Sequence, residues 1–171
     1  MWEKGLIMAK RKNPEGEFCT EFGNAWRKAG GHWYKIPDNR GIMAKFSPAR
    51  PYDIHAAIGG AFFTIEAKVP KSFRLRLKDF KPHQIPELLK ASKHGYQAYA
   101  VACYDHKSYG KKIADFFSVE VLEGLRLAGR DEVPHEYAAM RVYKLRGVGW
   151  DISPGQIKDM IGKKIEISEL I

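Results

Sequence analysis

The 171-residue sequence predicts a mixed α/β domain in which a central sheet is flanked by helices. Helix-like and strand-like patterns alternate along the chain, the pair Gly59-Gly60 joins two strand-like segments, and a long apolar segment follows. The composition agrees, because 44% hydrophobic and 29% charged residues are typical of globular proteins. We expect residues 13–171 to form one domain, preceded by a basic arm at residues 1–12.

The first part of the chain is predicted to hold one helix and three strands. Asn13 and Pro14 are typical of a helix start, because Asn caps the first turn and Pro suits the first helical position. Apolar residues at helical spacing extend this helix to about Ala29, where a Gly-Gly pair ends it. Strands are predicted at His32–Ile36, Tyr52–Ile58 and Ala61–Val69, the last two forming a hairpin.

The second part continues the alternation after a basic connector, Pro70–Lys81. A helix from Pro82 to about His94 is followed by an apolar strand, Tyr96–Tyr104, whose lack of polar alternation suits burial on both faces. The remaining predicted elements are a strand at Ile113–Val119, helices at Val119–Ala128 and Gly155–Ile161, and Tyr137–Leu145, which is ambiguous between strand and helix.

The charge balance favours a polyanionic partner. The formal net charge is +9, from 29 Lys and Arg against 20 Asp and Glu. Nucleic acid is the first candidate and an anionic membrane surface the second. No apolar run approaches a membrane span and no secretory signal is visible, so we expect a cytoplasmic protein without a membrane partner. Cys19 and Cys103 have no metal-site spacing and are interpreted as buried thiols.

Two acidic residues are placed symmetrically about the predicted hairpin turn. Asp53 lies six residues before Gly59, and Glu66 lies six residues after Gly60. In an antiparallel hairpin these positions face each other, and two opposed carboxylates repel unless a cation lies between them. The pattern predicts Mg²⁺, or Mn²⁺, held by both carboxylates and the backbone carbonyl of Ala67.

Lys68 shares a strand face with Glu66, because the two residues are two positions apart. A lysine beside a metal orients or deprotonates water, or stabilises charge on a phosphate. A solvated ion pair is the commoner meaning of Glu-x-Lys on a strand. The apolar residues Ile65 and Ala67 on the other face, and the basic segments nearby, favour a catalytic role.

These residues resemble a known signature. Pro51-Tyr52-Asp53 followed by Glu66-Ala67-Lys68 resembles the PD-(D/E)xK nuclease superfamily, and the residues from 72 to 84 resemble RecU-type Holliday junction resolvases, with matching Ser72-Phe73, Leu77-Lys78-Asp79-Phe80 and His83-Gln84. The resemblance covers about residues 51–104. It implies a restriction-endonuclease-like fold and a homodimeric, Mg²⁺-dependent crossover junction endonuclease that resolves four-way DNA junctions by paired nicks.

The resemblance also implies roles for individual residues. Asp53 and Glu66 are expected to bind the metal, Lys68 to be the catalytic lysine, and Gln84 to orient water or a phosphate. The alternative for Gln84 is a polar residue that caps its own helix turn.

The family also places an acidic residue on the first helix. Glu17 and Glu21 are both available. We select Glu21, because Phe22 and Trp26 anchor it beside the apolar stripe. A solvated helix glutamate is the alternative.

Basic residues around the predicted site are expected to bind the DNA backbone without reading sequence. Arg74 and Arg76 alternate with apolar residues, as on a strand with one basic face. Asp38–Arg50 is short compared with the long stalk of RecU proteins, so wedging of a junction by a protrusion is not expected. The predicted DNA-binding residues are Lys45, Arg50, Lys71, Arg74, Arg76, Lys78 and Lys81.

Three functions remain open at this point. The leading one is a junction resolvase acting as a dimer, with the apolar residues of the first helix and the C-terminal region as candidate interfaces. The second is a restriction-like or repair endonuclease acting on duplex or flap DNA. The third is a non-catalytic DNA-binding protein of the same fold, which has no evident need for clustered carboxylates.

Overall fold

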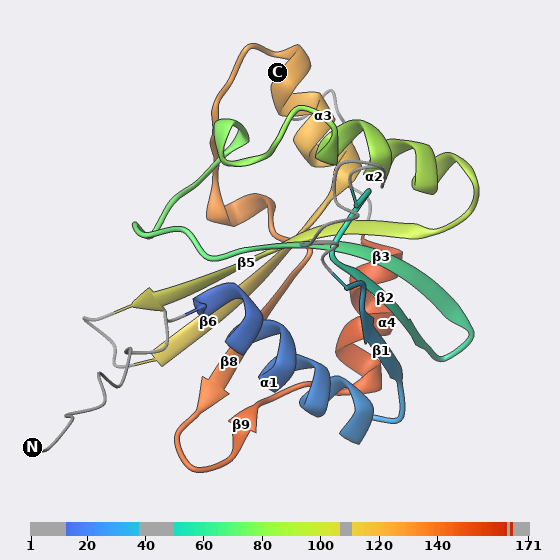
Figure 1. Cartoon of the computed structure of the whole chain (residues 1–171), viewed down its shortest axis with the longest axis vertical. Coiled ribbons are helices and arrows are strands. Elements are labelled where there is room, and N and C mark those ends of the chain that lie inside the picture. Colours follow the sequence, from blue (N-terminus) through green and yellow to red (C-terminus); the bar gives the residue numbers. More distant parts are fainter. Residues whose placement is uncertain (1–12, 38–49, 107–110, 164, 166–171) are drawn as a thin grey trace, which may run out of the picture.

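A central seven-stranded sheet with helices on both sides organises the molecule (Figure 1). The computed structural model describes residues 13–37, 50–106, 111–163 and 165, so the expected arm at 1–12 lies outside the described residues. The strand order is β1-β2-β3-β5-β6-β8-β9. β3 and β5 are parallel, whereas the other neighbouring pairs are antiparallel. The mixed sheet flanked by helices that the sequence predicts is confirmed.

The predicted helices and strands recur with boundaries shifted by a few residues. The observed elements are α1 (Pro14–Lys28), β1 (His32–Lys35), β2 (Ile54–Ile58), β3 (Ala61–Lys68), β4 (Leu75–Arg76), η2 (Leu77–Asp79), α2 (Gln84–Lys93), β5 (Gln97–His106), β6 (Lys111–Ser118), α3 (Val119–Leu127), β7 (Glu132–Val133), η3 (His135–Tyr137), β8 (Met140–Leu145), β9 (Gly149–Trp150) and α4 (Pro154–Gly162).

Local sequence sets the geometry of the β2–β3 hairpin. Gly59 and Gly60 both have positive φ, 57° and 79°, as a two-residue turn of this kind requires. The turn pairs Ile58 with Ala61 and Ile54 with Ile65. The next pair outward is therefore Asp53 with Glu66, as the symmetric spacing predicts.

Within the described residues, a hydrophobic core lies on each side of the sheet. Figure 1 shows the helices that cover the two sides. α1 and α4 pack on one side, where Phe22 and Trp26 are fully buried. α2 and α3 pack on the other side over the alanines of β5. β5 is thus covered on both faces, which confirms the interpretation of its unbroken apolar pattern. The apolar residues of α1 are occupied by the chain's own core, so the expectation that they form a dimer interface is wrong.

The ambiguous segment Tyr137–Leu145 divides into the end of a 3-10 turn and strand β8. Burial of Met140 and Val142 on one face explains the strand, because alternate residues contact the sheet core. Cys19 and Cys103 are buried free thiols, as expected. No helix within the described ranges is long and apolar enough to cross a bilayer.

Candidate active site

Asp53 and Glu66 lie together in the interior at the open end of the β2–β3 hairpin. Only 1% of Asp53 and 2% of Glu66 is exposed to solvent. Asp53 immediately precedes β2, and its backbone N–H donates to the carbonyl of Ile65 at 3.2 Å, which continues the ladder. Two buried carboxyl groups in one place are costly unless hydrogen bonds or cations compensate them.

The Asp53 carboxylate is fixed by two partners. Its Oδ1 forms an ion pair with Arg50 Nη2 at 2.7 Å, and its Oδ2 accepts the backbone N–H of Ala67 at 3.0 Å. Arg50 also donates to the carbonyl of Ile36 at 3.0 Å. Arg50, predicted as a DNA contact, therefore serves first as the counter-ion of Asp53.

Gln84 connects Glu66 to Lys68. Its Nε2 donates to Glu66 Oε1 at 2.7 Å, and its Oε1 accepts from Lys68 Nζ at 2.8 Å. Lys68 Nζ itself lies 3.4 Å from Glu66 Oε1. Gln84 Oε1 also accepts the backbone N–H of Lys81 at 2.8 Å, just before α2. The same amide thus fixes the start of its helix and contacts the predicted lysine and acid.

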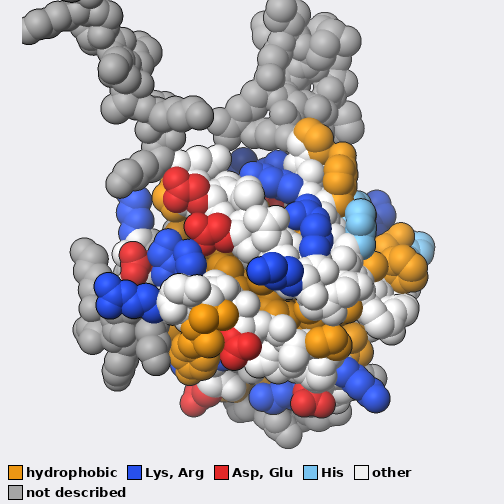
Figure 2. Space-filling model, turned by 90° about the horizontal axis from the view of Figure 1, so that it is seen from below, with side chains coloured by type: hydrophobic (Ala, Val, Ile, Leu, Met, Phe, Trp, Pro, Cys, Tyr) orange, Lys and Arg blue, Asp and Glu red, His pale blue; other side chains and the backbone are white. Residues whose placement is uncertain are grey.

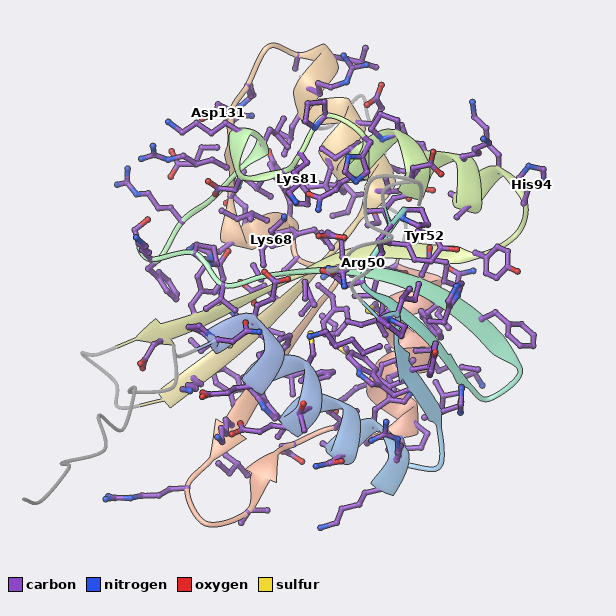
Figure 3. The ribbon with its side chains drawn as sticks, in the orientation of Figure 1. Arg50, Tyr52, Lys68, Lys81, His94 and Asp131 are labelled. Carbon is purple, nitrogen blue, oxygen red and sulfur yellow. The ribbon has the colours of Figure 1, made fainter. Side chains whose placement is uncertain are left out.

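Electrostatics in the site are unbalanced. Burial, followed by the charge of Asp53, raises the pKa of Glu66 to about 8 from its ordinary 4.5. Burial and the charge of Asp53 also raise the pKa of Glu15. Lys68 and Arg50 act in the opposite direction on Glu15, without reversing the shift. Figure 3 shows the labelled Arg50 and Lys68 near the centre of the molecule, with Lys81 above them toward α2.

The acidic residue that α1 brings toward this site is Glu15. Glu21, selected from the sequence, is exposed and pairs with Lys144 Nζ on β8 at 2.6 Å, so the structure does not bring it to Asp53 and Glu66. Glu17, the second choice, is exposed as well. Glu15 precedes Phe22 by seven residues and therefore lies on the buried stripe of α1. A glutamate at a position where the helical pattern expects an apolar residue is the sequence feature that could identify Glu15.

The donors in the site suit a hard divalent cation that keeps water and substrate as further ligands. Within the residues that the structure describes, no three His, Cys, Asp or Glu side chains form a complete metal cluster. Mg²⁺ is commonly bound by one or two carboxylates together with water and phosphate oxygens. Asp53 and Glu66 supply two such groups, and a bound cation would offset the burial and the charge of Asp53 that together raise the pKa of Glu66.

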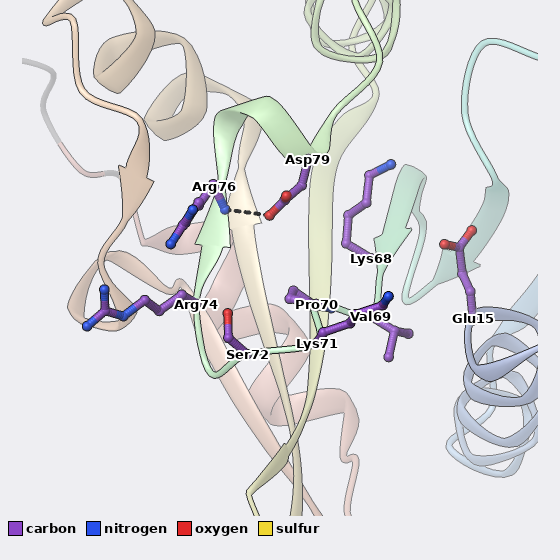
Figure 4. Close-up of a pocket in the computed structure, with 9 residues that line it drawn as sticks. All are labelled: Glu15, Lys68, Val69, Pro70, Lys71, Ser72, Arg74, Arg76 and Asp79. Carbon is purple, nitrogen blue, oxygen red and sulfur yellow. Dashed lines mark hydrogen bonds between the residues drawn. The ribbon is translucent and has the colours of Figure 1, made fainter.

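A basic cavity of about 600 Å³ opens beside Lys68. Figure 4 shows Glu15 approaching it from α1 on one side and Arg74 and Arg76 on the other. Asp79 accepts the backbone N–H of Arg76 at 2.9 Å, which closes the turn between β4 and η2. The cavity is lined by Glu15, Lys68, Val69, Pro70, Lys71, Ser72, Arg74, Arg76 and Asp79.

Apart from Arg50, the predicted DNA-binding residues that the structure describes divide into two groups. Lys71, Arg74 and Arg76 line the cavity, although Arg74 also pairs with Glu132 at 3.5 Å. Lys78 and Lys81 are exposed outside the cavity lining, and Lys45 lies outside the described residues. Figure 2 views the side with α1 and the β8–β9 hairpin, where acidic and basic side chains are interspersed.

Among solved structures, the chain is similar to a Holliday junction resolvase. This protein is Hjc from the archaeal hyperthermophile Archaeoglobus fulgidus, with 22% sequence identity and a TM-score of 0.47, over 62% of this chain and 78% of that chain. No protein-family model matches the sequence, and no curated protein matches it. Function must therefore be inferred from the residues of the site.

Proposed function

We propose that this chain is a metal-dependent DNA endonuclease whose active site is formed by Asp53, Glu66 and Lys68. The observation that carries the proposal is a pair of buried carboxyl groups, one with its pKa raised to about 8, joined through Gln84 to a lysine at the mouth of a basic cavity. Perturbed carboxyl groups in a cleft are typical of catalytic sites. The adjacent cations suit a polyanionic substrate.

Each residue has a task that its contacts support. Mg²⁺ or Mn²⁺, when bound, would supply Lewis acidity and a nucleophilic water. Asp53 and Glu66 would hold the cation, with Ala67 offering its carbonyl and Arg50 fixing Asp53. Lys68 would stabilise charge on the scissile phosphate or take a proton from water.

The auxiliary residues support this arrangement. Gln84 would hold the Lys68 ammonium in place through the 2.8 Å hydrogen bond. Glu15 would add negative charge on the α1 side of the site, since it is coupled electrostatically to Asp53. Lys71, Arg74 and Arg76 would contact backbone phosphates along the cavity, which positions DNA without reading its sequence.

The substrate we favour is a four-way DNA junction, cut by a homodimer. The RecU-like residues between 72 and 84 support this choice, and two identical active sites at a fixed separation suit paired nicks on a symmetric substrate. A restriction-like or repair nuclease with the same site would cut linear duplex or flap DNA equally well. A binding protein without activity would show salt-dependent affinity only.

The test is a cleavage assay with Mg²⁺ that compares a synthetic four-way junction with linear duplexes of its arm sequences. The full chain is expected to nick the junction symmetrically, and Asp53→Asn to bind it with cleavage reduced by about a thousandfold or more. Equal cutting of junction and duplex would overturn the junction preference alone. Absence of Mg²⁺- or Mn²⁺-stimulated cleavage of any DNA would overturn the nuclease.

A further inference from the structure

A second buried acid, Asp115, forms an ion cluster away from the proposed active site. Asp115 lies on β6 with no solvent exposure, opposite Ala102 on the α2–α3 side of the sheet. Arg141 of β8 binds both of its oxygens, with Nε at 2.7 Å from Oδ1 and Nη2 at 2.9 Å from Oδ2. His135 Nδ1 lies 3.0 Å from Oδ2. This geometry fixes the orientation of the His135 ring.

The other nitrogen of His135 contacts the basic connector. His135 Nε2 lies 2.9 Å from the backbone carbonyl oxygen of Phe73. A carboxylate and a carbonyl only accept hydrogen bonds, whereas a neutral imidazole has a single N–H to donate. Both bonds can therefore form together only with the protonated imidazolium, in which both nitrogens donate.

Phe73 divides the connector into a buried side and a cavity side. Its ring stacks on the His135 ring with centroids 4.2 Å apart and packs against Tyr104 at 4.9 Å. Ser72 and Arg74, on either side of it in sequence, line the basic cavity, whereas Phe73 does not. The backbone that carries the cationic wall is thus attached to the sheet through Phe73 and His135.

We propose that His135 is a positioning residue for DNA binding: its imidazolium, oriented by Asp115, holds the connector so that Lys71 and Arg74 face the phosphates. The inference rests on the proposed function, since it concerns the same cavity. Loss of the proton leaves one of the two hydrogen bonds unmade, and the connector loses a fixed attachment to the sheet. DNA affinity then falls as the pH rises.

The charged and titratable groups around His135 come from three strands and from the connector. Asp115 on β6 is the acid in contact with the ring, and it is already paired with Arg141 on β8. The Tyr104 hydroxyl on β5 stays protonated, because burial raises its pKa. On the connector side, Arg74 is paired with Glu132 of β7, the strand that pairs with β4.

The experiment measures the affinity of the full chain for a fluorescent four-way junction and a linear duplex, without divalent metal, between about pH 5 and pH 8, where imidazoles change charge. The salt dependence is recorded at each pH. For the wild type we expect about a tenfold loss of affinity across this interval, with a salt slope smaller by about 2 at the high end, since Lys71 and Arg74 would each cease to neutralise one phosphate.

His135→Gln should bind at the weaker level throughout and show no pH step from this residue. His135→Phe, which keeps the ring stacking but neither hydrogen bond, should behave in the same way. His94→Gln, an exposed histidine at the end of α2, is the matched control and should retain the wild-type profile.

Three results would overturn the inference. They are a wild type without a pH step, a pH step of the full wild-type size in both His135 variants, and variants that only lower the melting temperature while the salt slope stays unchanged. Failure of the wild type to bind any DNA at low pH would instead count against the proposed function. The two ideas therefore fail in distinguishable ways.

Discussion

The two buried acidic clusters of this protein differ in how their charge is neutralised. Asp115 is bound at both oxygens by Arg141 and contacted by His135, so its negative charge is fully matched. Asp53 and Glu66 are both buried at the same end of the hairpin, and Arg50 forms an ion pair with Asp53 but not with Glu66. Burial and repulsion then raise the pKa of Glu66, which the ammonium of Lys68 opposes only in part.

The difference separates a structural use of charge from a chemical one. A matched ion pair in a sheet fixes neighbouring strands and gains nothing from an additional ligand. An unmatched group of acids stays poised to take a proton or a cation, which is what metal-assisted hydrolysis requires. Burial alone does not distinguish the two clusters, because all three carboxylates are almost inaccessible.

Removing the charge of the acid should lower the free energy of unfolding much more in the Asp115 cluster than in the Asp53 cluster. Asp115→Asn is expected to cost about 3 kcal/mol of unfolding free energy, because an amide in place of the fully buried Asp115 carboxylate cannot accept at both positions from Arg141. Asp53→Asn should cost less than about 1 kcal/mol, since the amide oxygen can still accept the N–H of Ala67 and Arg50 keeps its bond to the carbonyl of Ile36. Urea denaturation of both variants without metal measures the difference. Equal losses would remove the distinction between the clusters.

The pH dependence of stability should report Glu66. Its pKa is raised in the folded state, so its contribution to stability is complete below about pH 4.5 and is lost as the pH rises through about 8. Glu66→Gln, which stays neutral, should be more stable than the wild type at alkaline pH without metal, by on the order of 2 kcal/mol. Melting temperatures in a chelator measure this. Wild-type and variant curves that remain parallel across pH would contradict the assignment.

The smallest expected effects concern the two glutamates of α1. Glu15→Gln is expected to lower metal affinity and cleavage about tenfold, because Glu15 is coupled to Asp53. Glu21→Gln removes the same charge from the same helix but only breaks the exposed pair with Lys144, so activity should be unchanged and stability should fall by less than about 1 kcal/mol. Calorimetric Mn²⁺ binding compares them. A larger loss for Glu21→Gln would restore the sequence-based choice.

Features that depend on short-range pattern could be predicted from the sequence. The Gly59-Gly60 turn sets the register of β2 and β3 without reference to the rest of the chain, so the opposition of Asp53 and Glu66 followed from counting residues. The helix start at Pro14 was visible in the same way. Its consequence for Glu15 was missed because an acid was expected beside the apolar stripe rather than on it.

Features that depend on distant strands could not be predicted. Asp115, His135 and Arg141 meet only because β6 and β8 are neighbours in a particular register, which pairs Asp115 with Arg141. No local motif marks any of the three. The role of Arg50 is missed for a different reason: Asp53 is only three residues away, but a basic residue in a polar segment indicates only attraction to anions.

The connector between β3 and α2 would, in the proposed nuclease, separate substrate binding from catalysis. Its two ends, at Lys68 and Gln84, are joined by a hydrogen bond, while the intervening residues carry the cations of the cavity wall. Under the proposed function, exchanging Lys71, Ser72 and Arg74 while keeping the buried Leu75 and the packed Phe73 would alter DNA binding and leave Asp53, Glu66 and Lys68 unchanged. If the chain is the proposed nuclease, a few exposed residues could change its substrate range without any change at Asp53 and Glu66.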